Sequence, residues 1–281
     1  MRLATFEKDG APEIGVVREE RIIPVSRAAP GLAADMVDLI SRWDQVKDEV
    51  GRIAAGTEGF ALGEVHLLAP IPKPGKILAI GLNYADHIKE TGAKAPAVQL
   101  WFSKAPGTAC GPHDPVQLPK ASAKVDYEVE MVAIIGRGGR HIAKSAAPAA
   151  VFGFCVGNDV SARDWQMATS QWVLGKSFDT HGPFGPWITT ADEVDAHSLG
   201  IRCLVNGELK QNSNTRHLLF NVWDQIEHLS KVMTLDAGDV IYTGTPGGVG
   251  LATQSFLKPG DRVRCEIDRL GAIENLFEPE R

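Results

Sequence analysis

The stretch VDYEVEMVAII, residues 125–135, constrains the fold more than any other feature of the sequence. A strand points successive side chains to opposite faces, so Asp126, Glu128 and Glu130 share one face of the expected strand. The second half, MVAII, is apolar at every position, which indicates a central strand rather than an edge strand. The other face is expected to consist of Val125, Tyr127, Val129 and Met131. The sequence therefore predicts a sheet whose interior contains several carboxylates.

Carboxylates in a central strand need compensation, because a buried charge must be paired or bound to a metal. One alternative is an edge strand with a solvated acidic face, since charged side chains are ordinary at protein surfaces. Pairing with Lys or Arg is a second alternative. A set of carboxylate oxygens is also what a hard cation such as Mg²⁺ or Mn²⁺ prefers, and two flexible Glu side chains can converge on one ion. Asp159, at an expected strand-to-helix junction, is a candidate third ligand.

Composition narrows the class of protein. The 281 residues are 44% apolar and 23% charged, as in ordinary globular proteins. The net charge of -6 comes without a long basic block, so we expect no nucleic-acid partner. The four cysteines form no Cys-x-x-Cys pair, which argues against a zinc cage and a disulfide framework. Apolar runs are far shorter than the roughly 20 residues that span a bilayer, and no signal-peptide core is present, so we expect a cytoplasmic protein without a membrane partner.

A proline-rich segment indicates a division of the chain. Residues 69–76, APIPKPGK, contain three prolines, which excludes a regular helix or a central strand. Before this segment, residues 1–26 have the pattern of short antiparallel strands, and residues 36–55 have helical spacing. We therefore expect a small N-terminal α+β domain over residues 1–70 and a larger domain over residues 71–281.

Strands outnumber helices in the expected larger domain. Asn206-Gly207 lies between two strand-like runs and is a strong hairpin signal, and residues 261–277 indicate a second hairpin. A helix is expected over residues 221–233, but strands and helices do not alternate as they do in a doubly wound fold. The expected fold class is α+β and rich in β-structure.

Three further segments contain candidate functional groups. His87 and Glu90 lie three residues apart on an expected helix, where the carboxylate would orient the imidazole as a general base toward water; a solvated surface pair is the alternative. Lys176 lies in VLGKSFD, which lacks the first Gly of a phosphate loop. In TGTPGGVG, residues 243–250, Pro246 argues against a dinucleotide turn, and the permissive backbone allows close approach of a small ligand.

Five motifs occur together between roughly residues 70 and 265: GLNYADHIKE, VDYEVEMVAIIG, GNDVSARDWQ, GKSFDTHGPFGPW and IYTGTPGGVG. In order and approximate spacing they resemble the fumarylacetoacetate hydrolase family. The resemblance implies a mixed β-sandwich or β-roll core of the fumarylacetoacetate hydrolase C-terminal type. It also implies a homodimer that holds Mg²⁺ or Mn²⁺ and acts on a 2-oxo acid.

The resemblance also implies roles for individual residues. Glu128, Glu130 and Asp159 match the metal ligands, whereas Asp126 matches a motif position outside that triad. Lys176 matches the site lysine, and His87 and Glu90 match the water-activating pair. Arg163, Gln166 and Thr245 match the substrate-contacting positions. The long form of the enzyme has an extra Asp ligand and a different Glu partner for its His, from segments without a match here. The chain therefore resembles the shorter branch of the family.

The expected reaction is hydrolytic cleavage of a carbon–carbon bond in a 2,4-dioxo acid, either an acylpyruvate or a 2,4-diketo-3-deoxy sugar acid, with release of pyruvate or a related 2-oxo acid. Oxaloacetate decarboxylation is one alternative, because it needs the metal and the lysine but no activated water. Isomerisation or hydration of an unsaturated 2-oxo acid and lysis of ureidoglycolate are others. A module that binds a divalent ion or a small acid without turnover is the alternative outside enzymes.

Overall fold

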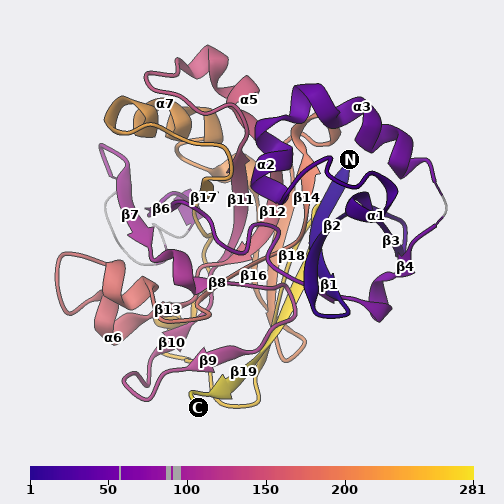
Figure 1. Cartoon of the computed structure of the whole chain (residues 1–281). Helices are drawn as coiled ribbons and strands as arrows, with labels where there is room; N and C mark the ends of the chain where they lie inside the picture. Colours follow the sequence, from indigo (N-terminus) through magenta and orange to yellow (C-terminus); the bar gives the residue numbers. More distant parts are fainter. Residues whose placement is uncertain (57, 87–89, 91–95) are drawn as a thin grey trace.

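The computed structural model describes residues 1–281 with the exception of 57, 87–89 and 91–95, and it is built mainly from strands (Figure 1). In this part of the chain, one mixed sheet has twelve strands. Its main path is β4 (Phe60–Ala61), β3 (Arg21–Pro24), β2 (Ala11–Arg18), β1 (Arg2–Lys8), β14 (Gly182–Thr190), β12 (Val151–Asn158), β11 (Val129–Ile135), β17 (Val240–Tyr242), β6 (Ile77–Gly81) and β7 (Leu100–Lys104). Off this path, β5 (His66–Leu67) pairs with β1 and β8 (Ala109–Cys110) with β14.

A second sheet packs against one face of the first. Among the described residues it has five strands, in the order β16 (Glu208–Asn214), β15 (Gly200–Val205), β18 (Arg262–Ile267), β19 (Gly271–Pro279) and β9 (Val116–Leu118). A separate two-stranded ladder joins β10 (Val125–Asp126) to β13 (Ser161–Ala162). The architecture is thus the predicted β-rich α+β class.

Helices lie outside the sheets. α2 (Met36–Ser41) and α3 (Trp43–Ala54) cover the large sheet on the face away from the second sheet, and α5 (Ala147–Ala150) packs beside α7 (Val222–Val232) (Figure 1). The other helical segments are short and lie in connections. They are α1 (Val25–Ala28), α6 (Arg163–Gln166), α8 (Gly250–Thr253), η1 (Leu62–Glu64), η2 (Pro106–Thr108), η3 (Lys144–Ala146), η4 (Val173–Lys176), η5 (Ala191–Glu193) and η6 (Thr215–His217). No helix among the described residues is long and apolar enough to cross a bilayer.

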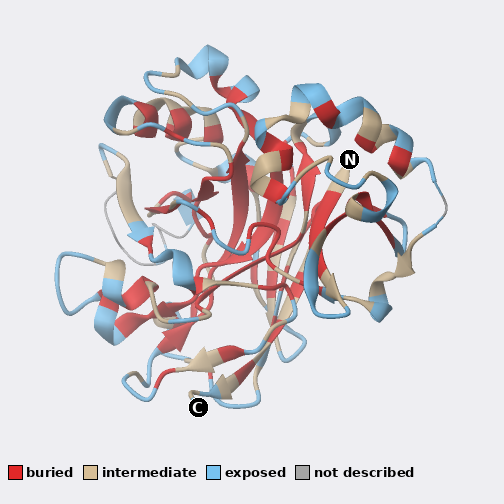
Figure 2. Ribbon diagram, in the orientation of Figure 1, coloured by how far each residue is buried: buried red, intermediate tan, exposed pale blue. Residues whose placement is uncertain are grey.

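The apolar run in β11 is buried on both faces, as a central strand requires. Met131 and Ala133 belong to the core shared with the second sheet, whereas Val132 and Ile134 belong to the core under α2 and α3. Figure 2 shows the same pattern, with the central strands buried and the outer helices partly exposed. The prediction of a central strand is therefore confirmed for Val129–Ile135.

The stretch 125–135 does not form one strand, in contrast to the prediction. β10 ends at Asp126 and pairs with β13, whereas β11 begins at Val129 and pairs with β12. The apolar alternation continues across this break, because Val125, Tyr127, Val129 and Met131 all join the core between the two sheets. The break puts Asp126 and Glu130 in different ladders, with Glu128 between them.

Most other predicted elements are present. The helix expected over residues 36–55 is divided at Arg42 into α2 and α3. The helix expected over residues 221–233 is α7, whose capping residue Asn221 accepts hydrogen bonds from the backbone of the first turn. The Asn206-Gly207 hairpin joins β15 to β16, and both residues have positive φ (51° and 81°), as a type I′ turn requires. The C-terminal hairpin is formed by β18 and β19.

Residues 1–70 contribute strands to the large sheet. β1 pairs antiparallel with β14 through Arg2 opposite Thr189 and Leu3 opposite Ile188. The first core residues of the chain therefore pack on strands that lie more than a hundred residues further on. The division into domains near residues 69–76 stays a prediction.

The close approach of β12 and β14 leads to a testable prediction. A Cβ added at Gly153 would lie 2.3 Å from the backbone oxygen of Thr189, which cannot move without breaking the ladder. We expect Gly153→Ala to lower the free energy of unfolding by about 2–3 kcal/mol. Gly63→Ala is the control, because no atom lies within 4 Å of its added Cβ. Chemical denaturation measures both, and equal stabilities of the two variants would contradict the described packing.

Candidate metal centre and active site

The candidate site lies at the end of the β11–β12 ladder, where Glu130 is paired with Gly157. Beyond the ladder, the backbone N–H of Asp159 donates to the carbonyl of Glu128 (2.9 Å). The backbone N–H of Glu128 in turn donates to the side-chain oxygen of Asn158 (2.9 Å). These bonds place the side chains of Glu128, Glu130 and Asp159 in one cluster.

The three predicted metal ligands converge. One carboxylate oxygen from each of Glu128, Glu130 and Asp159 lies within 4.8 Å of the others, and all three side chains are buried. Burial raises the pKa of Glu130 well above its usual range, and the charges of Asp159 and Glu128 raise it further. Such a cluster is costly unless cations surround or occupy it.

Two buried lysines contact Asp159 through its two different oxygens. Lys176, at the end of η4, places Nζ 2.8 Å from Oδ2 of Asp159 and 2.7 Å from Oε2 of Glu128. Lys104, at the end of β7, places Nζ 2.6 Å from Oδ1 of Asp159. Burial opposes the charged form of both amines. The charges of Asp159 and Glu128 outweigh burial at Lys176 and raise its pKa, whereas burial prevails at Lys104 and lowers its pKa.

The residues present fit a divalent cation. In the cluster, four buried carboxyl groups face three buried cations: Asp126, Glu128, Glu130 and Asp159 against Lys104, Lys176 and Arg163. Glu130 accepts a hydrogen bond from the N–H of Gly244 (2.7 Å), and no Lys or Arg of the described chain forms an ion pair with it. An excess of buried carboxylate with only oxygen donors matches the preference of Mg²⁺ and Mn²⁺.

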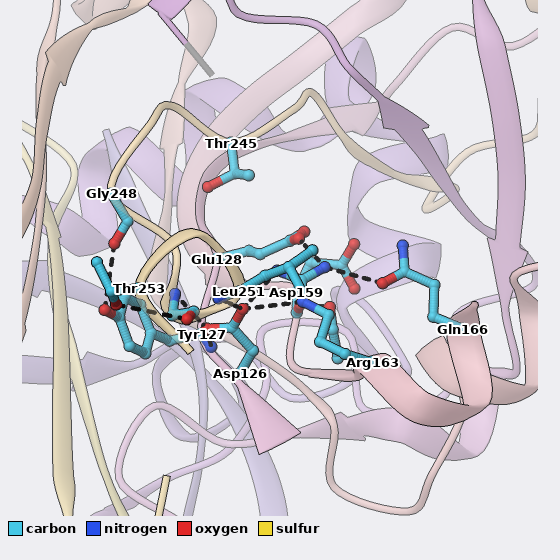
Figure 3. A network of polar contacts seen from close by, with 12 residues as sticks. Asp126, Tyr127, Glu128, Asp159, Arg163, Gln166, Thr245, Gly248, Leu251 and Thr253 are labelled. Carbon is cyan, nitrogen blue, oxygen red and sulfur yellow. Dashed lines mark hydrogen bonds and ion pairs between the residues drawn. The ribbon is translucent and has the colours of Figure 1, made fainter. Parts of the chain in front are cut away.

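Asp126 connects the cluster to the first turn of α8. Both nitrogens on one edge of the Arg163 guanidinium lie 2.8 Å from Oδ2 of Asp126, and its Nη1 lies 2.7 Å from Oε1 of Glu128 (Figure 3). Asp126 also accepts hydrogen bonds from the backbone N–H groups of Gly250 (2.7 Å) and Leu251 (2.8 Å). A single buried carboxylate thus fixes the guanidinium beside a predicted metal ligand and fixes one wall of the site.

Thr245 and Gln166 also lie at the cluster. Gln166 accepts a hydrogen bond from Nη1 of Arg163 (2.9 Å). The hydroxyl of Thr245 donates to the carbonyl of Val129 (2.9 Å) and accepts from Nε2 of Gln211 (2.9 Å). Gln211 comes from β16, so the second sheet supports the site directly.

The expected water-activating pair is described only in part. Oε2 of Glu90 accepts a hydrogen bond from the backbone N–H of Gly248 (2.8 Å). His87 lies outside the described residues, so its pairing with Glu90 stays a prediction. The bond to Gly248 nevertheless places Glu90 against the same loop that contains Thr245.

A single cavity brings most of these groups together. It has a volume of about 340 Å³, within the range of small-molecule sites. Two predicted metal ligands, the site lysine and the three predicted substrate contacts line it: Glu128, Glu130, Lys176, Arg163, Gln166 and Thr245. The arrangement can bind a small anionic molecule beside a cation, although the individual roles stay predictions.

Two buried site residues were missed by sequence analysis. Lys104 ends the run LWFSK, where a lysine after a strand is usually exposed. Gln211 lies in a hairpin strand of mostly polar residues, in which nothing distinguishes the one buried glutamine. Both residues are buried by contacts between segments that lie far apart in the chain. Such contacts become apparent only once the strands are assembled into sheets.

Fold and site together define a β-rich α+β protein with a buried carboxylate centre that opens into a small-molecule cavity. Residues 76–278 match the family model described as Fumarylacetoacetate (FAA) hydrolase C-terminal. The chain therefore belongs to the fumarylacetoacetate hydrolase family, a family of enzymes, as the sequence motifs predicted.

The relatives within this family are named for different reactions. A rat protein named Oxaloacetate tautomerase Fahd2a, mitochondrial, is 42% identical over 284 residues, which cover 98% of this chain and 91% of that protein. The crystal structure of maleylpyruvate hydrolase from Sphingobium sp. SYK-6, in complex with manganese(II) ion and pyruvate, has a TM-score of 0.85 and 34% identity. A 5-carboxymethyl-2-hydroxymuconate delta-isomerase from Mycobacterium smegmatis has a TM-score of 0.81 and 31% identity. Both structures match over 100% of each chain, so the predicted fold is confirmed while the reaction stays open among these classes.

The excess of carboxylate predicts a metal-dependent stability. Mn²⁺ at a hundredfold excess over its Kd should raise the free energy of unfolding by about 2.7 kcal/mol. Glu130→Gln keeps the acceptor for Gly244 but removes the charge, so this stabilisation should largely disappear, while the metal-free variant should be at least as stable as the wild type. Glu20→Gln, at an exposed position, is the control. An undiminished Mn²⁺ effect in Glu130→Gln, measured by thermal unfolding with and without chelator, would contradict the assignment.

The contacts of Asp126 predict a large structural cost when its charge is removed. Asp126→Asn leaves the buried Arg163 with a weaker partner and replaces an acceptor needed by Gly250 or Leu251 with a donor. We expect a loss of about 3–5 kcal/mol in the free energy of unfolding. Asp268→Asn removes the half-exposed partner of Arg202 and should cost less than about 1 kcal/mol. Comparable losses in urea denaturation of the two variants would show that Asp126 has no special role.

Proposed function

We propose that the chain is a divalent-metal-dependent hydrolase that cleaves a carbon–carbon bond in a 2,4-dioxo acid and releases pyruvate or a related 2-oxo acid. The observation that supports this most is the convergence of Glu128, Glu130 and Asp159 beside Lys176 at the cavity. A non-catalytic binding module would not need a buried lysine held against the predicted ligands.

Glu128, Glu130 and Asp159 are proposed to hold Mg²⁺ or Mn²⁺. When bound, the cation would act as a Lewis acid that polarises the 2-oxo group and stabilises negative charge on it. The manganese(II) ion in the similar maleylpyruvate hydrolase supports Mn²⁺ as one occupant. The donor set itself suits either ion.

The other predicted site residues have separate roles in the proposed reaction. Arg163, Gln166 and Thr245 orient the acid, and His87, with Glu90, takes a proton from water as its oxygen bonds to C4. The C3–C4 bond then breaks, and its electron pair stays with C3 as the enolate of the 2-oxo acid. The ammonium of Lys176 stabilises this developing charge as a preorganised donor. Return of the proton to C3 gives the 2-oxo acid, and C4 leaves as a carboxylic acid.

A second candidate is keto–enol tautomerisation of oxaloacetate. It is supported by the names of relatives that match this chain over nearly its whole length, such as the rat protein at 42% identity. The same lysine would stabilise the same kind of enolate, but no water is added and no carbon–carbon bond breaks. Decarboxylation of oxaloacetate would also pass through such an enolate.

The remaining expectations from the sequence stay proposals. They are a 2-oxo acid as the substrate, a homodimer as the assembly, no nucleic-acid or membrane partner, and a cytoplasmic location. Several relatives are named as mitochondrial proteins, so measurement of the location is the direct test of the last of these.

Lys176→Ala tests the role of the buried amine. Loss of a preorganised donor to the enolate should lower kcat for an acylpyruvate by about 10²- to 10³-fold. Mn²⁺ binding is measured in parallel by calorimetry, because Lys176 also contacts two predicted ligands. Lys258→Ala, at an exposed position, should keep normal turnover. Near-normal kcat in a Lys176→Ala protein that binds Mn²⁺ would refute the proposed role.

His87→Ala separates the two candidate reactions. Hydrolysis of acylpyruvates needs the activated water and should fall steeply, whereas loss of the enol absorbance of oxaloacetate should continue if the chain only moves a proton. His113→Ala, at an exposed position, is the control. If the wild type converts oxaloacetate but hydrolyses no 2,4-dioxo acid, the hydrolase proposal is wrong and the tautomerase proposal replaces it.

A further inference from the structure

We propose that the apolar lining of the cavity binds an apolar acyl group. The substrate class would then be acylpyruvates whose distal group is aliphatic or aromatic, rather than a dicarboxylate or a polyhydroxylated sugar acid. This inference rests on the proposed function, because it assumes that a 2-oxo acid lies with its oxo acid group at the carboxylate centre.

Most polar groups of the cavity are linked by short contacts. Arg163 and Lys176 lie 2.7 Å from the two oxygens of Glu128. Gln166 lies against Arg163, and Thr245 bonds to the carbonyl of Val129, the neighbour of Glu128. A ligand therefore meets charge and hydrogen-bonding groups at these residues, and the apolar lining begins directly beside them, because Nζ of Lys176 lies 5.1 Å from the ring centroid of Phe102.

The remaining described lining is apolar except for the Gly81 backbone. It consists of Ile80, Leu82, Phe102, Met167, Trp172 and Leu251. These side chains lie at the end of β6, on β7, on α8 and between α6 and η4, so they form a wall assembled from four parts of the chain. Apolar walls select ligands by the surface they remove from water.

Two aromatic rings pack against each other in this wall. Phe102 and Trp172 have ring centroids 5.5 Å apart at an interplanar angle of 57°. The indole of Trp172 also lies directly against Gly81, where an added Cβ would be 2.4 Å from Cζ3 of the ring. The absence of a side chain at Gly81 therefore allows the indole to reach its position at the cavity.

Leu82 is held in an unusual conformation beside these rings. Its φ is 54°, in the left-handed region that non-glycine residues rarely adopt and that costs energy for a leucine. The next residue, Asn83, donates from Nδ2 to the carbonyls of Phe220 (3.0 Å) and Thr243 (2.7 Å) and accepts from the N–H of Phe220 (2.9 Å). These bonds fix the turn, which places a leucine rather than a glycine at the cavity.

A second carboxylate on the ligand has no described partner at this wall. Both cations of the described lining, Arg163 and Lys176, already form ion pairs with buried carboxylates. A distal carboxylate or a row of hydroxyls would lose water against apolar side chains without replacement hydrogen bonds. An alkyl or phenyl group would instead gain affinity from the same contact.

Binding of 2-oxo acids without a 4-oxo group tests the inference separately from turnover, because these compounds have no bond for the hydrolase to cleave. Calorimetry on the Mn²⁺-loaded full chain compares pyruvate, 2-oxobutanoate, 2-oxopentanoate and 2-oxohexanoate. Each added methylene should lower Kd about fourfold until the wall is filled. 2-Oxoglutarate, which is 2-oxopentanoate with a terminal carboxylate, should bind at least about tenfold more weakly than 2-oxopentanoate. Equal or tighter binding of 2-oxoglutarate, or no dependence on chain length, overturns the inference.

Substitutions in the apolar lining measure its contribution to ligand affinity. Leu82→Gly suits the left-handed backbone and removes only the apolar side chain, and Trp172→Ala removes the indole. Both should flatten the chain-length dependence and leave the Kd of pyruvate within about twofold. Trp165→Ala is the matched control, because this tryptophan lies on α6 but does not line the cavity. Unchanged chain-length dependence in both wall variants overturns the inference.

The two proposals can fail separately. If longer 2-oxo acids bind more tightly but no acylpyruvate is hydrolysed, the apolar subsite is supported and the hydrolase proposal is overturned. If acylpyruvates are hydrolysed but 2-oxoglutarate binds as well as 2-oxopentanoate, the hydrolase proposal is supported and the apolar subsite is overturned.

Discussion

The site depends on one electrostatic constraint, the burial of four carboxyl groups against three cations at the end of a central ladder. The ladder fixes the backbone of Glu130 and Asp159, so their side chains cannot separate to relieve repulsion. Compensation must come from groups that reach the same place. Lys104 lies at the end of β7, Lys176 lies at the end of η4, and Arg163 lies on α6. The positions of β7, η4 and α6 are thus linked to the charge of the cluster.

The two lysines contact the same carboxylate oxygens that a metal would use, and this has a chemical consequence. Lys104 and Lys176 contact different oxygens of Asp159, and Lys176 also contacts Glu128. A cation bound by these carboxylates competes with the ammonium groups for the same lone pairs. Metal binding would therefore release Lys176 in part from its ion pairs and make its protons available to a ligand. The same amine would in this way stabilise the carboxylates before a metal binds and, in the proposed reaction, stabilise the enolate.

The sequence predicted the central strand and the two hairpins, because each depends on local alternation or turn chemistry. The convergence of Asp159 with Glu128 and Glu130 was predicted from its place after a strand and from the resemblance to the family. It predicted one continuous strand at residues 125–135, and here a local rule was insufficient. Asp126 pairs in register with Ser161 of β13, whereas Glu130 pairs with Gly157 of β12. The division between these two partners is decided by tertiary pairing. Lys104 and Gln211 were missed for the same reason, since their burial depends on segments that are distant in the chain.

The order in which the chain assembles follows from the distances in sequence between the parts of the site. The site is complete only when β11 has paired with both β12 and β17 and η4 has packed against β7. Only then do the four side chains of Glu128, Asp159, Lys176 and Thr245 lie together. Loop closure makes such non-local contacts slow to form. A chain with only its hairpins formed would have no place for a divalent cation. Uptake of Mn²⁺ during refolding would therefore mark the completion of the native topology, not an early collapsed state.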